Sequence, residues 1–179
     1  LAFDRSPGDS QTRMRPLHQE MPQRVVRAFD GGDGMAVTHL HNLSGGVLGG
    51  DQLRLEVNVG PQAQAQLTTT GATRVYRHRP GPDASQQTTL RVARDGLLEF
   101  LPDPLIPFAG ARYQQQVAIE LAEGAGLFYW DMLAPGREAS GEVFAFERVG
   151  LALELCAGGE VVALERMELE PALRPLTSP

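Results

Sequence analysis

The chain has 179 residues, of which 42% are hydrophobic and only 6% aromatic, and its formal net charge is −6. This length suits one domain with a single core, and we treat residues 1–179 as one domain. The negative charge argues against nucleic acid and anionic membranes as partners, and no apolar run approaches the roughly 18 residues of a membrane span. All 16 basic residues are arginine, which excludes lysine-dependent chemistry such as a P-loop or a Schiff base.

Residues 1–23 contain three prolines and no apolar segment of the kind that signal peptides have. We expect this region to be only partly ordered. Cys156 is the single cysteine, so there is no internal disulfide framework and the chain suits a reducing compartment. The expected location is the cytoplasm.

Four units share one pattern, in which a strand with apolar residues at every second position leads through a glycine turn into a similar strand. They are residues 53–69 with Gly60, 89–101 with Gly96, 115–132 with Gly124, and 151–167 with Gly158-Gly159. This pattern is typical of β-hairpins. The sequence therefore predicts an all-β fold of stacked hairpins, forming two layered sheets or a β-helix-like coil. At most one or two short helices are expected, at 17–29 and 71–79, and the glutamines at 62–66 and 114–116 are predicted to lie on a solvated sheet face.

Two glycine pairs, at positions 45–46 and 49–50, precede Asp51 and the first alternating strand. Glycine permits positive φ angles and close backbone approach, and we expect Gly49 and Gly50 to adopt conformations that other residues avoid. A phosphate-binding loop would be followed by a helix, whereas here a strand follows. Asp51 has two interpretations: a side chain that caps the turn, or a carboxylate that a rigid loop presents to a metal ion.

Other polar residues are weaker candidates. His39 and His41 share one face of a strand, which is plausible metal-ligand spacing or an ordinary surface pair. Glu142 is predicted to form an ion pair with Arg137 or to face a water path. Alternation places Asp131 on the same side as Tyr129, predicted to be the outward side. No nucleophile and base are recognisably placed, so we do not expect an enzyme.

Four motifs occur in a fixed order along the chain. They comprise Gly45, Gly46, Gly49, Gly50 and Asp51; Thr68, Thr69, Arg74, Val75 and Tyr76; residues 98–102 ending in Pro102, with Ile106 and Phe108; and Gly136, Arg137, Gly141 and Glu142. In this series the sequence resembles the UreD family of urease accessory proteins, called UreH in some organisms. Arg74 replaces the family's usual lysine, and Thr70 replaces a frequent glutamine. The chain is also shorter than family members, which implies a fragment lacking the C-terminal part.

The resemblance implies a non-enzymatic chaperone for urease maturation. Such a scaffold would bind apo-urease and, through UreF, recruit the GTPase UreG for nickel insertion. No tightly bound cofactor is implied, only transient nickel binding, for which Asp51 and then Glu142 are the candidate ligands. Arg137 and Tyr76 are candidate interface residues. The alternative from a different class is a stacked-β carbohydrate-active enzyme or carbohydrate-binding module, which a row of exposed aromatic residues beside clustered acids would favour.

Overall fold

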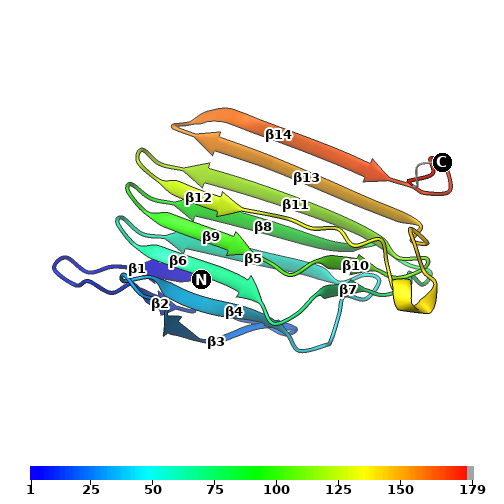
Figure 1. Ribbon diagram of the computed structural model, residues 1–179, viewed down its shortest axis with the longest axis horizontal. Coiled ribbons are helices and arrows are strands. Elements are labelled where there is room, and N and C mark those ends of the chain that lie inside the picture. The colour runs from blue at the N-terminus through cyan, green and yellow to red at the C-terminus, as the bar shows by residue number, and fades with distance from the viewer. Residues whose placement is uncertain (177–179) are drawn as a thin grey trace.

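The computed structural model describes residues 1–176, and Figure 1 shows strands stacked in two main layers. Sheet A contains, in spatial order, β14 (Glu160–Leu169), β13 (Arg148–Ala157), β11 (Arg112–Leu121), β8 (Ala84–Val92), β5 (Gln52–Val59), β1 (Ala2–Asp4) and β2 (Arg13–Arg15). Sheet B contains β12 (Gly126–Tyr129), β9 (Leu97–Leu101), β6 (Gln64–Thr69), β4 (Ala36–Asn42) and β3 (Gln23–Asp30). Sheet C pairs β10 (Leu105–Pro107) with β7 (Thr73–Val75), and a short 3-10 helix spans Glu138–Ser140.

The chain winds through these sheets as a series of coils. It passes from β5 in sheet A through β6 in sheet B to β7 in sheet C, and then repeats this path through β8, β9 and β10. A third coil runs from β11 to β12. Strands of successive coils pair in parallel, as β5 does with β8 and β8 with β11. The predicted all-β class, with layered sheets and a β-helix-like coil, is confirmed.

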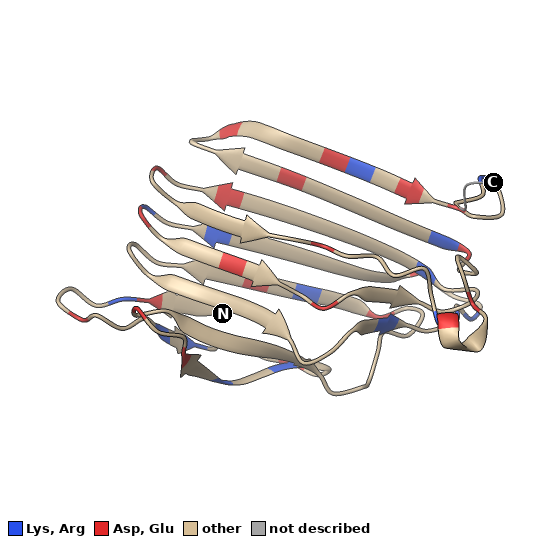
Figure 2. Cartoon of the chain, in the orientation of Figure 1, with Lys and Arg blue, Asp and Glu red and all other residues tan. Residues whose placement is uncertain are grey.

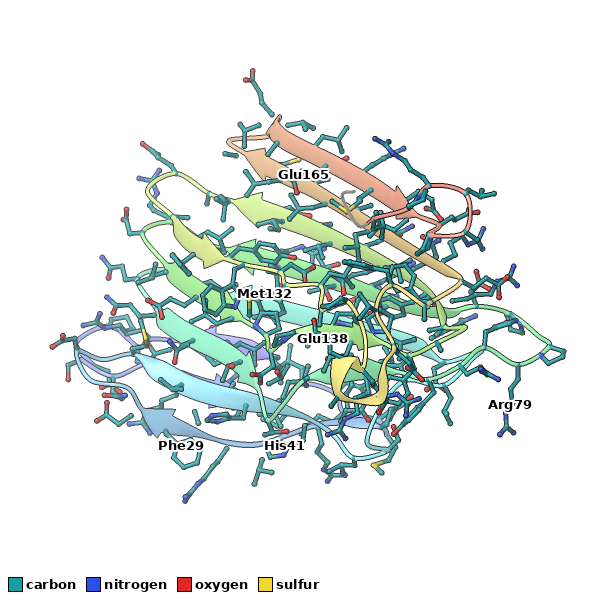
Figure 3. All side chains as sticks on the ribbon, turned by 45° about the vertical axis from the view of Figure 1, so that its right-hand side comes forward. Phe29, His41, Arg79, Met132, Glu138 and Glu165 are labelled. Carbon is teal, nitrogen blue, oxygen red and sulfur yellow. The ribbon has the colours of Figure 1, made fainter. Side chains whose placement is uncertain are left out.

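The core lies between sheets A and B because one face of each strand is apolar. In β5, Leu53, Leu55, Val57 and Val59 are buried while the residues between them are more exposed. The facing side chains of sheet B include Leu67, which is also buried and which forms the larger of two hydrophobic clusters with Leu55, Val57 and Val59. Leu53 belongs to the second cluster. Side chains of both sheets fill the space between the layers (Figure 3). The period-two pattern of the sequence thus identified the buried face of these strands.

The predicted turns at Gly60, Gly96, Gly124 and Gly158-Gly159 all lie between strands, as expected. The first three are four-residue turns closed by similar hydrogen bonds, as in Ala63 N to Gly60 O at 3.2 Å. The third residue of each turn has a positive φ angle, and these residues are Gln62, Asp95 and Gly124. The turns also stack, since the amide of each of the first two such residues donates to a carbonyl in the turn of the next coil.

The prediction that the two arms of each unit pair as hairpins is wrong for the first three units. Their arms lie in different sheets and pair with the equivalent strands of neighbouring coils, as β5 does with β8 and β6 with β9. Alternation defines which face of a strand is buried, but it does not define the neighbouring strand. The fourth unit is a true hairpin, in which β13 and β14 pair antiparallel. Its turn residues have φ angles of 58° and 85°, as a tight hairpin turn requires.

Neither segment that could hold a short helix, 17–29 or 71–79, is helical in the described structure, where β3 and β7 occupy parts of these ranges. Both segments have a buried valine, Val25 in β3 and Val75 in β7, and β-branched residues fit a half-buried sheet well. Residues 1–23 include β1 and β2, and Phe3 is fully buried. Within residues 1–176 there is no helix long and apolar enough to cross a membrane.

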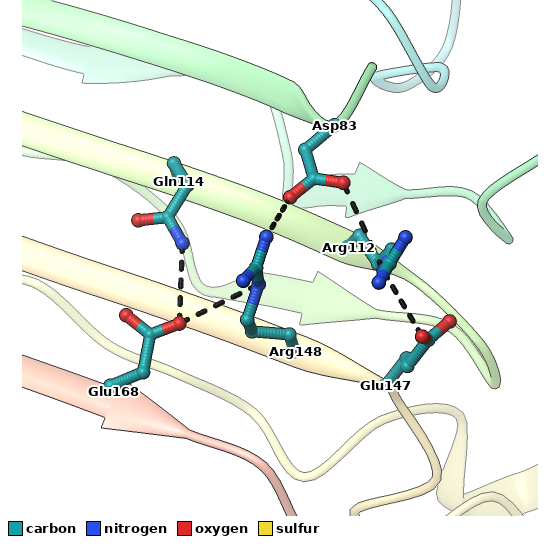
Figure 4. Close-up of polar contacts among 6 residues, drawn as sticks. All are labelled: Asp83, Arg112, Gln114, Glu147, Arg148 and Glu168. Carbon is teal, nitrogen blue, oxygen red and sulfur yellow. Dashed lines mark hydrogen bonds and ion pairs between the residues drawn. The ribbon is translucent and has the colours of Figure 1, made fainter. Parts of the chain in front are cut away.

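An ion-pair network joins the upper strands of sheet A (Figure 4). Arg148 of β13 bonds to Asp83 beside β8, and its Nε lies 3.6 Å from Glu168 of β14. Arg112 of β11 pairs with Glu147 at 3.1 Å. Elsewhere, arginines and acidic residues are interspersed along the strands (Figure 2). The network thus links β8, β11, β13 and β14 through charged side chains at one end of the sheet.

Candidate functional site

The four sequence motifs meet at the end of the coils where sheet C lies. The loop that contains the glycine pairs bonds to β7, through Val47 N to Arg74 O at 2.7 Å and Tyr76 N to Val47 O at 2.9 Å. β7 pairs in parallel with β10, and Phe108 N continues this pairing by donating to Val75 O. The glycine loop, β7 with Tyr76, and β10 with Phe108 therefore form one compact region although they are distant in sequence. Together with the segment from Gly136 to Glu142, we call this region the motif cluster.

Aromatic and charged side chains connect these segments. The rings of Tyr76 and Phe108 meet edge to face with centroids 5.2 Å apart, and the guanidinium of Arg137 lies 4.1 Å from the Phe108 centroid. Arg137 pairs with Glu142 through two hydrogen bonds, one of them from Nε at 2.9 Å. The Tyr76 hydroxyl donates to Gly45 O at 3.3 Å. One continuous set of contacts thus runs from the glycine loop to Glu142.

The glycines of this loop are required for two different reasons. Gly45 and Gly50 have φ angles of 78° and 87°, which disfavour other residues. Gly46 permits close approach, because a Cβ atom there would lie 2.5 Å from the Tyr76 ring and 2.8 Å from Arg74 O. The expectation of an unusual conformation is therefore right for Gly50 and wrong for Gly49, where a Cβ atom would have its nearest neighbour at 3.5 Å.

Asp51 closes the loop by capping its turn. Its Oδ2 accepts from Leu48 N at 2.9 Å, and its own amide donates to Leu48 O. Glu142 accepts from Ala109 N at 3.0 Å in addition to Arg137. Arg137 and this amide stabilise the charged carboxylate, which lowers the pKa of Glu142 to about 2. In residues 1–176, no three His, Cys, Asp or Glu side chains gather closely enough to hold a metal ion, and the assignment of Asp51 and Glu142 as nickel ligands stays a prediction.

The other motif residues have structural contacts. Thr68 Oγ1 donates to Leu101 O at 2.7 Å, and Thr69 Oγ1 bonds both the carboxylate and the amide of Asp103. Gly141 ends the 3-10 helix with a φ angle of 74°. At Gly136, a Cβ atom would lie 2.7 Å from Glu142 O. These contacts position the loops around the motif cluster.

A polar cavity of about 190 Å³ lies next to the motif cluster, between sheets A and B. Motif residues Gly45, Gly46, Thr69, Arg74 and Pro102 line it, and its inner wall carries the polar side chains of Gln86, Thr88, Tyr113, Gln115, Tyr129 and Asp131. Because one water takes up about 30 Å³ in the liquid, the cavity has room for several. Its lining carries several polar side chains, whereas most buried residues of the larger hydrophobic cluster are apolar.

Asp131 is the central charged group of this cavity. It accepts hydrogen bonds from Gln115 Nε2 and, at 3.3 Å, from the Tyr129 hydroxyl. Its pKa is raised, chiefly by burial and against the effect of these hydrogen bonds. The residue is exposed on its other side, so the carboxylate lies at an opening of the cavity. The Tyr113 hydroxyl, 3.5 Å from Gln86 and 3.4 Å from Gln115, extends the network into the core.

Asp131 shares a side with Tyr129 and is exposed, as expected, but its carboxylate also lines the cavity. Phe128 and Trp130, on the other side, are 54% and 44% exposed. The side of Asp131 lies at the cavity because Tyr129 stacks on Phe100, with ring centroids 5.8 Å apart. The prediction of a solvated face is wrong for Gln115, which lines the cavity. Gln86, which no sequence signal marked, stands beside Gln115 in the sheet register.

The remaining histidine candidates lie on β4, away from the cavity-lining set. The His39 ring packs edge to face against Phe29, with centroids 5.9 Å apart. His41 stands opposite Arg24 in the pairing of β3 with β4, and Figure 3 shows it beside the lower strands. This arrangement agrees with an ordinary surface pair.

Comparison with known proteins gives a consistent result. A family model described as UreD urease accessory protein matches residues 1–179. A urease accessory protein UreD from Herpetosiphon aurantiacus is 45% identical over all of this chain, which covers 62% of that relative. The UreD of Marinobacter nauticus is 37% identical over 94% of this chain and 57% of its own length. For the UreD of Sorangium cellulosum, the figures are 41% identity over 73% of this chain and 41% of the relative. The chain therefore spans less than two thirds of the length of these relatives.

Proposed function

The chain belongs to the UreD family of urease accessory proteins, and from this premise we propose that it is a non-catalytic cytoplasmic scaffold for urease maturation. It binds apo-urease and, through UreF, recruits the GTPase UreG. Nickel, the cargo of this assembly, contacts the scaffold only transiently on its way to the urease active site. The observation that carries the proposal is the family match over the whole chain.

The polar cavity supports the nickel step. Asp131 and Asp103 contribute carboxylates to its lining, and Thr69 and Thr88 contribute hydroxyls. Oxygen ligands without thiolates bind Ni²⁺ more weakly than closed nitrogen and sulfur sites do, as release to another protein requires. We therefore add Asp131 to the candidate ligands. Asp51 stays ahead of Glu142, because its turn cap uses only Oδ2 while Arg137 engages both oxygens of Glu142.

The motif cluster supports the partner step. Tyr76 and Arg137 offer planar surfaces of the kind that interfaces favour, although both also hold the cluster together through Phe108. We propose that this end of the coils contacts UreF. The competing assignment, a purely structural role for both residues, is the outcome against which the proposal is tested.

The main experiment removes the gene from its native host. Urease subunits should accumulate normally, but the purified urease should contain little nickel and have little activity, and the intact gene should restore both. Normal nickel content and activity in the deletion strain would refute the proposal.

A second experiment measures Ni²⁺ binding by calorimetry on the parent chain and on Asp51→Ala, Asp131→Asn and Glu142→Gln. Weak binding is expected, with the largest losses for the two aspartate variants. Gln66→Ala is the control, because Gln66 donates to Glu99 on the outer face of sheet B. Equal binding by all four proteins and the control would exclude these carboxylates.

A third experiment captures UreF with the parent, Tyr76→Ala and Arg137→Ala proteins after circular dichroism has shown that each is folded. We expect both variants to capture less UreF. Folded variants that capture UreF at the parent level would make these two residues structural.

The carbohydrate alternative receives less support. Phe128 and Trp130 are an exposed aromatic pair, but the polar cavity carries two carboxylates, Asp103 and Asp131, and not the clustered acids that this function would require. Family membership points to maturation instead.

A further inference from the structure

The two sheets do not end together. Three times the chain leads from a strand of sheet A into one of sheet B, from β5 to β6, β8 to β9 and β11 to β12. After β13 it turns back into β14 of the same sheet. In the described residues, sheet B therefore stops at β12 while sheet A extends two strands further, and Figure 1 shows β13 and β14 beyond β12.

The inner face of these two strands is apolar and incompletely covered. Leu151, Leu153 and Leu155 of β13 are only partly buried against the core clusters. Directly across from the first and second of them stand Met167 and Glu165 of β14, and Met167 is 53% exposed. Residues paired in this way share a face, so the apolar surface continues from β13 onto β14.

The edge of sheet B beside this face has free hydrogen-bonding groups. The amides of Gly126 and Trp130 donate to Gly96 O and Phe100 O, toward β9. Because alternate residues of a strand direct their amides to opposite sides, Leu127 and Tyr129 direct theirs to the other edge. Within residues 1–176, β12 pairs with β9 alone. An apolar face and an unpaired strand edge thus lie next to each other.

We propose that a further β-strand pairs with the free edge of β12 and covers the inner face of β13 and β14. Its source is the part of the protein that the longer relatives have outside the matched region, which makes up more than a third of the Herpetosiphon relative. This strand should carry apolar side chains at every second position, facing Leu151 and Leu153. It should also bring a basic or hydrogen-bond-donating residue near Glu165 (Figure 3). The inference does not depend on the proposed function.

Thiol labelling tests the proposal with two matched sites on β14. Met167→Cys reports on the inner face and Leu164→Cys on the outer face, where the parent side chains are 53% and 57% exposed. Each cysteine variant also carries Cys156→Ser, so that it has a single thiol. Each is made in this chain and in a chimera, in which this chain replaces the matched part of the Herpetosiphon relative. We expect the chimera to slow labelling at position 167 about tenfold or more, because access governs thiol reactivity. Labelling at position 164 should be unchanged.

Equal labelling of position 167 in both proteins would overturn the proposal, as would protection of both positions in the chimera. If labelling of position 167 is slow in this chain by itself and slows further as the protein concentration rises, a second copy covers the face. That result would also overturn the proposal. Hydrogen exchange on the intact Herpetosiphon relative is independent of how the chimera folds. Slow exchange at the positions aligned with Leu127 and Tyr129 is expected, and exchange as fast as in a free strand edge would contradict the added strand.

Discussion

The inner face of sheet A changes from polar to apolar between the two ends of the coils. At the end near the motif cluster, β8 and β11 carry the paired residues Gln86 and Gln115, whereas four residues further on they carry Leu90 and Ile119. Leu90 and Ile119 are buried, and the turns at this end stack through backbone hydrogen bonds. The polar end is joined by both backbone and side-chain hydrogen bonds and encloses a cavity. The same strands thus carry apolar core residues at one end and line the cavity of the candidate site at the other.

The largest expected effect is in the apolar core between sheets A and B. Leu67→Ala should lower the free energy of unfolding by about 2–5 kcal/mol, because it leaves a cavity in a core where Leu67 is 1% exposed. Denaturant titration measures this loss. Leu173→Ala is the control, since Leu173 is 78% exposed and a surface change costs less than about 0.5 kcal/mol. Similar losses of unfolding free energy for both variants would mean that Leu67 does not belong to the buried core.

At the polar end, close packing of the glycine loop should produce a smaller effect. Gly46→Ala should cost about 1–3 kcal/mol, because the added Cβ atom would overlap the Tyr76 ring and Arg74 O. Gly49→Ala should change stability by less than about 0.5 kcal/mol, since its Cβ atom would make only ordinary contacts. The same denaturant titration distinguishes the two variants. A larger loss for Gly49→Ala than for Gly46→Ala would show that Gly46 is not the glycine packed against Tyr76 and Arg74.

The sequence predicts the fold better than the site. Alternation gives the buried face and the turns, because both depend on neighbouring residues. It does not reveal that β5 pairs with β8, since nothing local in either strand specifies a partner one coil away. The direction of Asp131 depends on Tyr129 stacking against Phe100 of another strand, a tertiary contact. The motif resemblance indicated the residues around Gly45 and Glu142, but only the structure shows that they surround a polar cavity.

Acid should weaken the motif cluster before the core. The pKa of Glu142 is lowered from 4.5 to about 2 in the folded protein, so its stabilising contribution is complete above pH 4.5. That contribution is lost as the pH falls from 4.5 toward 2. We expect the thermal unfolding temperature of the parent to fall more steeply over this interval than that of Glu142→Gln. Parallel curves for the two proteins would contradict a stabilising ion pair with Arg137.

The smallest effect on stability is expected at Asp131. Its raised pKa means that the ionised carboxylate is less favourable in the folded than in the unfolded chain. This cost is present above the folded pKa and disappears as the pH falls below the unfolded value near 3.8. Asp131→Asn should therefore unfold at the same or a slightly higher temperature than the parent at pH 7. A clearly lower unfolding temperature would show that the carboxylate is there for stability.

The parallel pairing of successive coils has a consequence for how the chain folds. Gln52 pairs with Ser85, 33 residues further on, and β11 pairs with β13 across a comparable separation, as with Arg112 and Arg148. Such a strand can gain its hydrogen bonds only after a long loop has closed, and proteins dominated by distant contacts fold slowly. The local antiparallel pairings of β13 with β14, β3 with β4 and β1 with β2 are exceptions and can form early. Newly made chains should therefore pass through a period in which strand edges are unpaired and self-association competes with coil formation.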